Sequence, residues 1–410
     1  MLTGIAEKNQ PEARRSEFLS GTVDKWRWIF KDFKQRGYAT LFSEDSPGLA
    51  AFNYRLKGFK NPPTDHYARP FWLEADKLLE DFCISGRAAH NISLEYLLSF
   101  FRAYKNKPKF SLTTHADISH NDQNAIGYVD FDLKSILQTL QKENFLANTL
   151  LIIFSDHGAR FSDLRKTIQG KLEERLPFMS ITLPKWFIEK YPDLHSNLVH
   201  NSKVLTTPFD VYATLRHILS YPYSPNEIRT GQSLFNKIDE ESRTCENAGV
   251  EEHWCPCLNL EEISTDEPLI KIMAEFVITF MNNLMFKNSH LENLCHKLVL
   301  KKINSVFRDM PSEKVQYFAK SRRDNDCDSC GLVFGEKSTN TLVDDTLYQL
   351  QFVTSPNEGF YEASVKMKRG VPSLAGDVSR IDAYKDQPYC IAEKFPLLRK
   401  YCYCSPKPAR

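Results

Sequence analysis

Two side chains that could bind a metal ion stand next to each other at the end of an apolar segment. Residues 150–154 are Leu-Leu-Ile-Ile-Phe, and Ser155, Asp156, His157 and Gly158 follow them. The run is typical of a strand buried on both faces, and ligands in open α/β sheets lie beyond the carboxyl ends of strands. Gly158 permits unusual dihedral angles, so both side chains could approach one ion. A carboxylate with an imidazole suits Zn²⁺, Mn²⁺ or a similar divalent metal; the alternative is a polar turn.

A second polar segment follows another predicted strand. Residues 110–114 are strand-like, and the segment HADISHND occupies residues 115–122. It offers two histidines and two aspartates, which are His115, Asp117, His120 and Asp122. One turn-rich loop with these side chains could contribute to the same site, and the alternative is a solvated loop.

Basic residues follow the Asp-His pair and could form an anion-binding rim. They are Arg160, Arg165, Lys166 and Lys171. Guanidinium and ammonium groups bind phosphate or sulfate oxygens, and we expect Arg160 to contact the substrate. The alternative is a solvated, charged face. Four other histidines, His195, His200, His217 and His253, are interpreted as structural or surface residues.

The elements around these residues alternate between strands and helices through about residue 220. Helices are predicted over 22–37, 124–143 and 206–219, the last with Thr207 as its cap. This alternation favours a mainly parallel sheet with helices on both faces.

The second half of the chain has a different character. Three segments, TLYQLQFVT, GFYEASVKM and DVSRIDAY, alternate apolar and polar residues and predict half-exposed antiparallel strands. We therefore expect an α/β domain over residues 1–240 and a cysteine-bearing α+β subdomain over 241–410.

Composition excludes some classes of function. A net charge of +1 over 410 residues does not suggest nucleic-acid binding, and no stretch approaches the ~20 apolar residues of a membrane helix. Nine of the ten cysteines lie in the second half, which fits disulfides and an oxidising compartment. The alternatives are free thiols or a zinc knuckle, for which the candidate ligands are Cys255, Cys257, Cys327 and Cys330. No signal peptide begins the sequence.

The segment NTLLIIFSDHGARF resembles the metal-binding strand of the alkaline-phosphatase-like superfamily, which includes sulfatases and nucleotide pyrophosphatase/phosphodiesterases. The segment TPFDVYATLRHIL followed by GQSLF is similar to a sulfatase-like pattern. The resemblance implies an alkaline-phosphatase-like fold in which Asp156 and His157 bind a divalent metal, Zn, Mn, Mg or Ca. The resemblance also implies that, in the segment DISH, His120 is catalytic and Asp117 is a metal ligand. The Asp-to-His spacing in this segment is one residue shorter than in the Asp-x-x-x-His motif of some superfamily members.

A narrower resemblance covers essentially the whole chain. Segments such as GYATLFSEDSPGLAAFNY, PTDHYARPFW, AGVEEHWCPC and RKYCYC are similar to an uncharacterised animal family of sulfatase-like proteins with a domain of unknown function. The start, MLTGI, resembles the segment just after the superfamily's nucleophile. Thr3 is the only nearby hydroxyl, and nothing marks it as activated.

These observations predict a metal-dependent hydrolase of small phosphate or sulfate esters that lacks its N-terminal nucleophile segment. The alternative is a non-catalytic, secreted or membrane-associated protein of the same fold that binds an anionic ligand. The resemblance and the cysteines imply an extracellular or secretory-pathway location. We expect no nucleic-acid partner and no membrane-spanning segment in this chain.

Overall fold

The structure is a computed structural model that describes residues 1–410 except 16, 121, 224–229, 288, 311–345 and 406–410. The chain forms two compact units. The first comprises Met1–Val250 with Glu393–Leu397, and the second comprises Glu251–Ala392 with Leu398–Arg410. The sequence predicts a division after residue 240, whereas the contacts divide the chain after Val250.

A short parallel sheet organises the first unit. Its order is β2 (His66–Tyr67), β1 (Ala39–Glu44) and β6 (Lys109–Thr114). The strands β1 and β6 run in parallel register from Ala39 opposite Lys109 to Glu44 opposite Thr114, so their carboxyl ends meet at one edge. Four principal helices accompany this sheet: α1 (Ile29–Gln35), α3 (Ala89–Ala103), α5 (Asp130–Lys142) and α9 (Pro208–Ser220).

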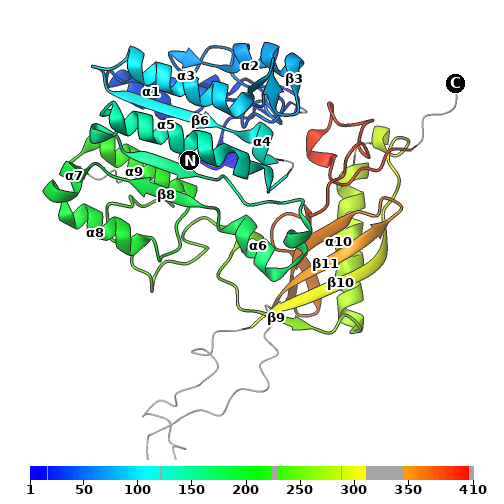
Figure 1. The fold of residues 1–410 in the computed structure, drawn as a ribbon. Helices are drawn as coiled ribbons and strands as arrows, with labels where there is room; N and C mark the ends of the chain where they lie inside the picture. Colours follow the sequence, from blue (N-terminus) through cyan, green and yellow to red (C-terminus); the bar gives the residue numbers. More distant parts are fainter. Residues whose placement is uncertain (16, 121, 224–229, 288, 311–345, 406–410) are drawn as a thin grey trace, which may run out of the picture. The chain divides into compact units, whose positions relative to one another are not determined.

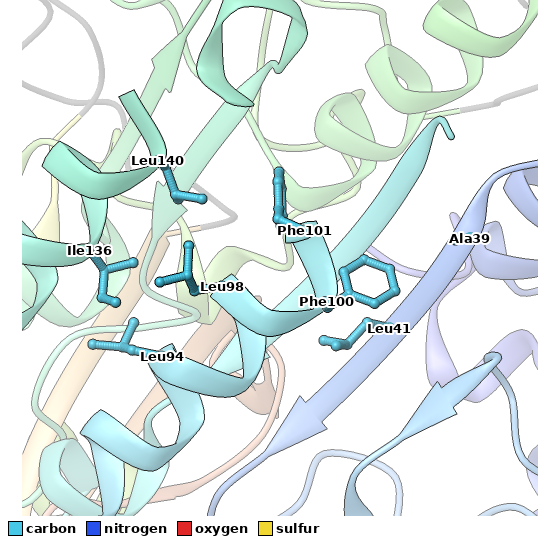
Figure 2. Packing of buried hydrophobic residues seen from close by; sticks show 8 residues of the cluster. All are labelled: Ala39, Leu41, Leu94, Leu98, Phe100, Phe101, Ile136 and Leu140. Carbon is cyan, nitrogen blue, oxygen red and sulfur yellow. The ribbon is translucent and has the colours of Figure 1, made fainter. Parts of the chain in front are cut away.

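Helices α3 and α5 cover one face of the sheet. Figure 2 shows Phe100 of α3 beside Leu41 of β1, while Leu98 faces Ile136 of α5. Helix α3 is therefore apolar on two sides, and both sides are buried in one cluster. Burial of such side chains stabilises the fold by roughly 1.5–3 kcal/mol each.

Helix α1 covers the other face through aromatic contacts. The ring of Phe33 stacks on Phe110 of β6 at 4.0 Å between centroids, and Phe30 lies 5.4 Å from Phe42 of β1. The predicted helix over 22–37 is shorter than expected, because the backbone is extended at Trp26 and the helix begins only at Ile29. These contacts confirm the prediction that helices lie on both faces of the sheet.

The strand that carries the Asp-His pair differs from its prediction. Strand β7 (Leu151–Phe154) pairs antiparallel with β8 (Met179–Thr182), and all four residues of β7 are only half-buried. In the described part of the chain, β7 pairs with β8 alone and β6 pairs with β1 alone. The expected strand buried on both faces is therefore wrong, because the side chains of β7 remain only half-buried. Ile152 still packs on the α1–α9 cluster with Phe110.

Shorter elements complete the first unit. These are α2 (Arg69–Ala75), β3 (Leu79–Glu80), β4 (Cys83–Ile84), β5 (Arg87–Ala88), α4 (Ala116–His120), α6 (Ile168–Arg175), α7 (Lys185–Lys190) and α8 (Pro192–Asn201).

An antiparallel sheet and one long helix form the second unit (Figure 1). The sheet order is β13–β12–β11–β10–β9, and β14 also pairs with β12. Their bounds are β9 (Leu260–Ile263), β10 (Val299–Asp309), β11 (Thr346–Ser355), β12 (Phe360–Lys368), β13 (Val371–Leu374) and β14 (Ser379–Arg380). The predicted antiparallel strands are confirmed.

Their predicted half-exposure is wrong for β11 and β12. Leu350 and Ala363 are buried on one face, and Gln351 and Glu362 are buried on the other. The amide nitrogen of Gln351 donates to Glu362 at 3.1 Å, which satisfies polar groups that an alternating pattern would place in water.

Helix α10 (Pro268–Phe286) packs against β10. Among the described helices it alone is long and apolar enough to cross a membrane, judged by length and composition. The core helices of globular proteins have the same properties, and Met273, Val277 and Met281 of α10 are fully buried.

Six of the described cysteines are disulfide-bonded. Cys295 bonds to Cys402 and Cys390 bonds to Cys404, and Cys245 and Cys255 are also disulfide-bonded. Among the described cysteines, Cys83 and Cys257 are free thiols. The knuckle candidates Cys327 and Cys330 lie outside the described residues.

Candidate metal and anion site

Asp156 and His157 follow β7 directly, and their side chains converge. The Oδ2 atom of Asp156 lies 3.6 Å from the Nε2 atom of His157. The other ring nitrogen, Nδ1, lies 2.8 Å from the carbonyl oxygen of Gly158. A protonated Nδ1 that donates to this carbonyl leaves Nε2 as a lone-pair donor, which is how metal-binding histidines are usually oriented. Both side chains are substantially exposed, so an ion could reach them from solvent.

Gly158 serves this turn for a different reason from the one expected. Its φ is not positive, so the site does not need glycine's unusual dihedral angles. A Cβ at this position would instead lie 2.3 Å from the carbonyl oxygen of Glu173 on α6. The absence of a side chain lets the turn after β7 lie directly against the backbone of α6.

The basic residues beyond this turn have separate roles. The Nε atom of Arg160 is buried without a hydrogen-bond partner, and its guanidinium carbon lies 5.0 Å from the centre of the Phe161 ring. Arg165 is fully buried and forms an ion pair with Glu174 of α6. Lys166 pairs with Asp163 at 2.6 Å. Arg165 and Lys166 are thus engaged within this segment, while Arg160 keeps a donor for an anion.

The segment after β6 forms the short helix α4 rather than a loop, and it carries two predicted site residues. Asp117 is half-buried in its first turn, and His120 is exposed at its last residue. Burial raises the pKa of the Asp117 carboxyl, and the nearby carboxylate of Asp76 raises it further. No hydrogen bond or ion pair joins Asp117 to Asp156 in the part of the chain that the structure describes.

Asp45 stands beside Asp117, although sequence patterns do not single it out as a site residue. It follows β1 immediately, as His115 follows β6, and the last paired residues of these strands are Glu44 and Thr114. The Oδ1 atom of Asp45 accepts hydrogen bonds from the backbone N–H groups of residue 116, at 2.8 Å, and of Asp117, at 3.2 Å. Parallel pairing therefore brings Asp45 and His115 to the same edge of the sheet.

The facing atoms of this pair lack hydrogen-bond partners. Oδ2 of Asp45 and Nδ1 of His115 are both buried and unpartnered, and they lie 3.9 Å apart. Burial raises the pKa of Asp45 to about 7, against the opposing effect of the backbone N–H groups of residues 117 and 116. Burial lowers the pKa of His115 to about 4, and the charge of nearby His90 lowers it further. Each group is therefore poorly solvated in its charged form.

His90 adds a second buried imidazole nitrogen without a partner. Its Nε2 atom hydrogen-bonds Oδ2 of Asp132 at 2.8 Å, and its Nδ1 atom is buried without a partner. Oδ2 of Asp117 is likewise buried and unpartnered. Among the described residues, the tight groups of three or more metal-capable side chains consist of cysteines, so the ligand atoms of Asp45, His115 and their neighbours lie farther apart than those of such a group.

The family described as a protein of unknown function (DUF229) matches residues 1–304. The chain belongs to this family. The DUF229 region contains all of the candidate site residues and ends within β10 of the second unit. No curated protein and no solved structure matches the chain. The predicted membership of a family with a domain of unknown function is thereby confirmed.

Proposed function

We propose that this DUF229 protein binds a divalent metal ion through Asp156 and His157 and uses it to bind, and where a nucleophile is supplied to hydrolyse, a phosphate or sulfate ester. The fixed imidazole of His157 is the observation that carries this proposal. A polar surface turn has no need to hold one ring nitrogen on a backbone carbonyl and the other beside a carboxylate. A metal site needs both, because the ligand nitrogen must be deprotonated and correctly aimed.

The metal would supply a positive charge that polarises an ester oxygen. Asp156 and His157 can provide an oxygen and a nitrogen ligand, a donor set that suits Zn²⁺ or Mn²⁺ better than Mg²⁺ or Ca²⁺. Arg160 can bind the ester's anionic oxygens, since its buried Nε still needs a hydrogen-bond acceptor. His120, exposed at the end of α4, is the proposed catalytic histidine, and Asp117 is a proposed further ligand.

We place the chain in the alkaline-phosphatase-like superfamily as part of the same proposal. The segment FSDHGARF and the sheet flanked by helices support this placement. The disulfides support a secreted or secretory-pathway location, because cytosolic thiols are normally kept reduced.

Metal content and anion binding test the proposal. The chain is stripped with a chelator and its free thiols are alkylated. It is then reloaded with Zn²⁺ or Mn²⁺, unbound metal is removed by dialysis, and the bound metal is counted by elemental analysis. The double variant Asp156→Ala with His157→Ala should lose one equivalent and should no longer bind inorganic phosphate or sulfate in a metal-dependent way. Asp193→Ala with His195→Ala, another neighbouring pair on helix α8, is the matched control and should retain both. Equal metal content in all three proteins would refute the site.

The environment of Thr3 favours a second candidate function, in which the protein binds an anionic ligand without catalysing a reaction. Its hydroxyl is buried and donates to the carbonyl oxygen of Ile5 at 3.0 Å, so it is not presented as a nucleophile. Aryl phosphate and aryl sulfate assays with added metal separate the two functions. Metal-dependent binding without turnover supports the second candidate, and turnover that Asp156→Ala abolishes supports the hydrolase.

A further inference from the structure

We propose that Asp45 and His115 form the core of a second divalent-cation site at the carboxyl edge of β1 and β6. Its ligands follow β1 and β6, whereas Asp156 and His157 follow β7, which pairs with β8. Its occupant would be Zn²⁺ or Mn²⁺, because the donors are carboxylate oxygens and imidazole nitrogens.

The burial of Asp45 is the first reason. Its side chain is 1% exposed, yet Oδ2 has no hydrogen-bond partner. A buried polar atom without a partner destabilises the fold, and more so if it is charged. Buried carboxylates are therefore paired, protonated or bound to a metal. Among the described residues, the one group within 4 Å that could carry a positive charge is His115, and its Nδ1 atom is too far away for a hydrogen bond.

The distance between the two ligand atoms is the second reason. Zinc binds carboxylate oxygens and imidazole nitrogens at about 2.0–2.2 Å. One ion can therefore bridge Asp45 Oδ2 and His115 Nδ1, which lie 3.9 Å apart. A direct hydrogen bond would need these atoms about 1 Å closer. The gap is too wide for a direct bond and suits an ion between the two groups.

His90 is the third reason. A histidine that binds a metal commonly donates its other ring N–H to a carboxylate. His90 has this arrangement, with Nε2 on Asp132 and Nδ1 buried without a partner. The unpartnered Nδ1 atom makes His90 a candidate for a further ligand.

The structural role of Asp45 does not account for these features. Capping of α4 uses only Oδ1, which accepts both backbone N–H groups. A serine or an asparagine could make the same cap without burying a carboxylate. Capping does not explain the unpartnered second oxygen of Asp45 or the unpartnered Nδ1 atoms of His115 and His90, which a bound cation would satisfy.

Conservative variants test this site in the full chain with its free thiols alkylated. Asp45→Asn keeps the capping carbonyl and removes the charge. We expect it and His115→Ala each to bind one equivalent of Zn²⁺ less than the wild type. Asp132→Asn, which alters only the partner of His90, should weaken Zn²⁺ binding about 10–100-fold without abolishing it.

Asp24→Asn is the matched control, because Asp24 also caps the backbone, at residues 60 and 61, but has no histidine partner. It should bind as much Zn²⁺ as the wild type. If Asp156→Ala lost the same Zn²⁺ equivalent as Asp45→Asn, so that combining the two changes removed no more metal, that ion would belong to the site at Asp156 and His157. If combining them removed a further equivalent, the chain would have two sites. Full Zn²⁺ content in folded Asp45→Asn and His115→Ala would overturn the inference.

A measurement on the wild-type chain covers the case in which these variants fail to fold. Fe²⁺ is bound in place of Zn²⁺, and peroxide with ascorbate then cleaves the backbone near the ion. Cleavage near residues 45 and 115 that excess Zn²⁺ suppresses supports the proposed site. Zn²⁺-sensitive cleavage confined to residues 156–157 contradicts it.

Discussion

The amide nitrogen of Gly158 donates a hydrogen bond to the carbonyl oxygen of Glu174 at 3.2 Å, which fixes the turn after β7 onto helix α6. The side chain of Glu174 is in turn held by the buried Arg165. The candidate metal ligands Asp156 and His157 thus lie on a turn whose position depends on α6.

Gly158→Ala should therefore weaken metal binding without changing any ligand. The added Cβ would lie 2.3 Å from the Glu173 carbonyl oxygen, so the turn or the helix must move. Overpacking of this kind typically costs about 1–3 kcal/mol. We expect a lower denaturation midpoint and a weaker affinity for Zn²⁺, measured by chemical unfolding and by titration. Gly48→Ala is the control, because a Cβ there meets nothing within 4 Å; an equal effect of both changes would contradict this explanation.

Asp45→Asn should stabilise the metal-free protein at high pH. The folded-state pKa of about 7 lies above the ordinary value of 3.8, so the folded protein binds more protons than the unfolded chain between these values. The contribution of Asp45 to the free energy of unfolding is therefore fully present below about pH 4 and is lost as the pH rises through about 7. With chelator present, the variant should match the wild type near pH 4 and exceed it at pH 8, by up to about 4 kcal/mol.

Asp24→Asn should show the opposite sign. Burial raises the pKa of Asp24, but hydrogen bonds, including those from the backbone of residues 60 and 61, outweigh it and hold the pKa at about 2. Its stabilisation is present above about pH 4 and lost as the pH falls through about 2, so this variant should be less stable than the wild type at pH 8. Parallel urea titrations at pH 4, 6 and 8 compare the two. Equal and pH-independent effects would show that neither carboxyl is perturbed.

Arg243→Met should strongly destabilise the first unit. Nη2 of Arg243 donates to both oxygens of Asp210, at 2.8 and 2.7 Å, and both side chains are almost completely buried. Removing one partner of a buried pair costs about 3–5 kcal/mol. Arg216→Met, which breaks a pair with Asp32 that is about one-fifth exposed, should cost much less. Urea unfolding measures both, and similar losses would argue against a special role for burial.

The disulfides Cys295–Cys402 and Cys390–Cys404 should stabilise the protein unequally. The first joins residues 107 apart, and the second joins residues 14 apart. In the chain-entropy treatment, loops of these sizes contribute about 4.7 and about 3 kcal/mol. Both cysteines of a pair must be replaced by serine, because Cys402 Sγ lies 3.8 Å from Cys404 Sγ and a lone thiol could exchange. The variant without Cys295–Cys402 should unfold at the lower denaturant concentration; the reverse order would contradict the prediction.

Local signals predicted the helices well where caps marked them. Thr207 caps α9, and Asp210 completes the capping box, as the segment TTPFD indicates. The same signals could not show that Asp210 also binds Arg243, because that contact depends on how distant segments fold together. The predicted helix at 22–37 failed for a similar reason, since tertiary packing buries Trp28 and keeps the preceding backbone extended.

The site was only partly readable from the sequence. The convergence of Asp156 and His157 followed from their adjacency at a strand end. Asp45 was missed because FSEDSP reads as a strand followed by a turn, and only the parallel register places it opposite His115. The one available signal was a pair of acidic residues directly after an apolar strand, Glu44 and Asp45. His90 gave no signal, because its Asp132 partner lies on another helix.

The Cys295–Cys402 bond also decides what becomes of the chain if a protease cuts it. A single cut anywhere between these two cysteines produces two polypeptides that stay covalently joined until a reductant is added. Nicked and intact molecules would then co-migrate on a non-reducing gel and separate only after reduction. A protein built in this way can be proteolytically processed within this span without shedding either fragment.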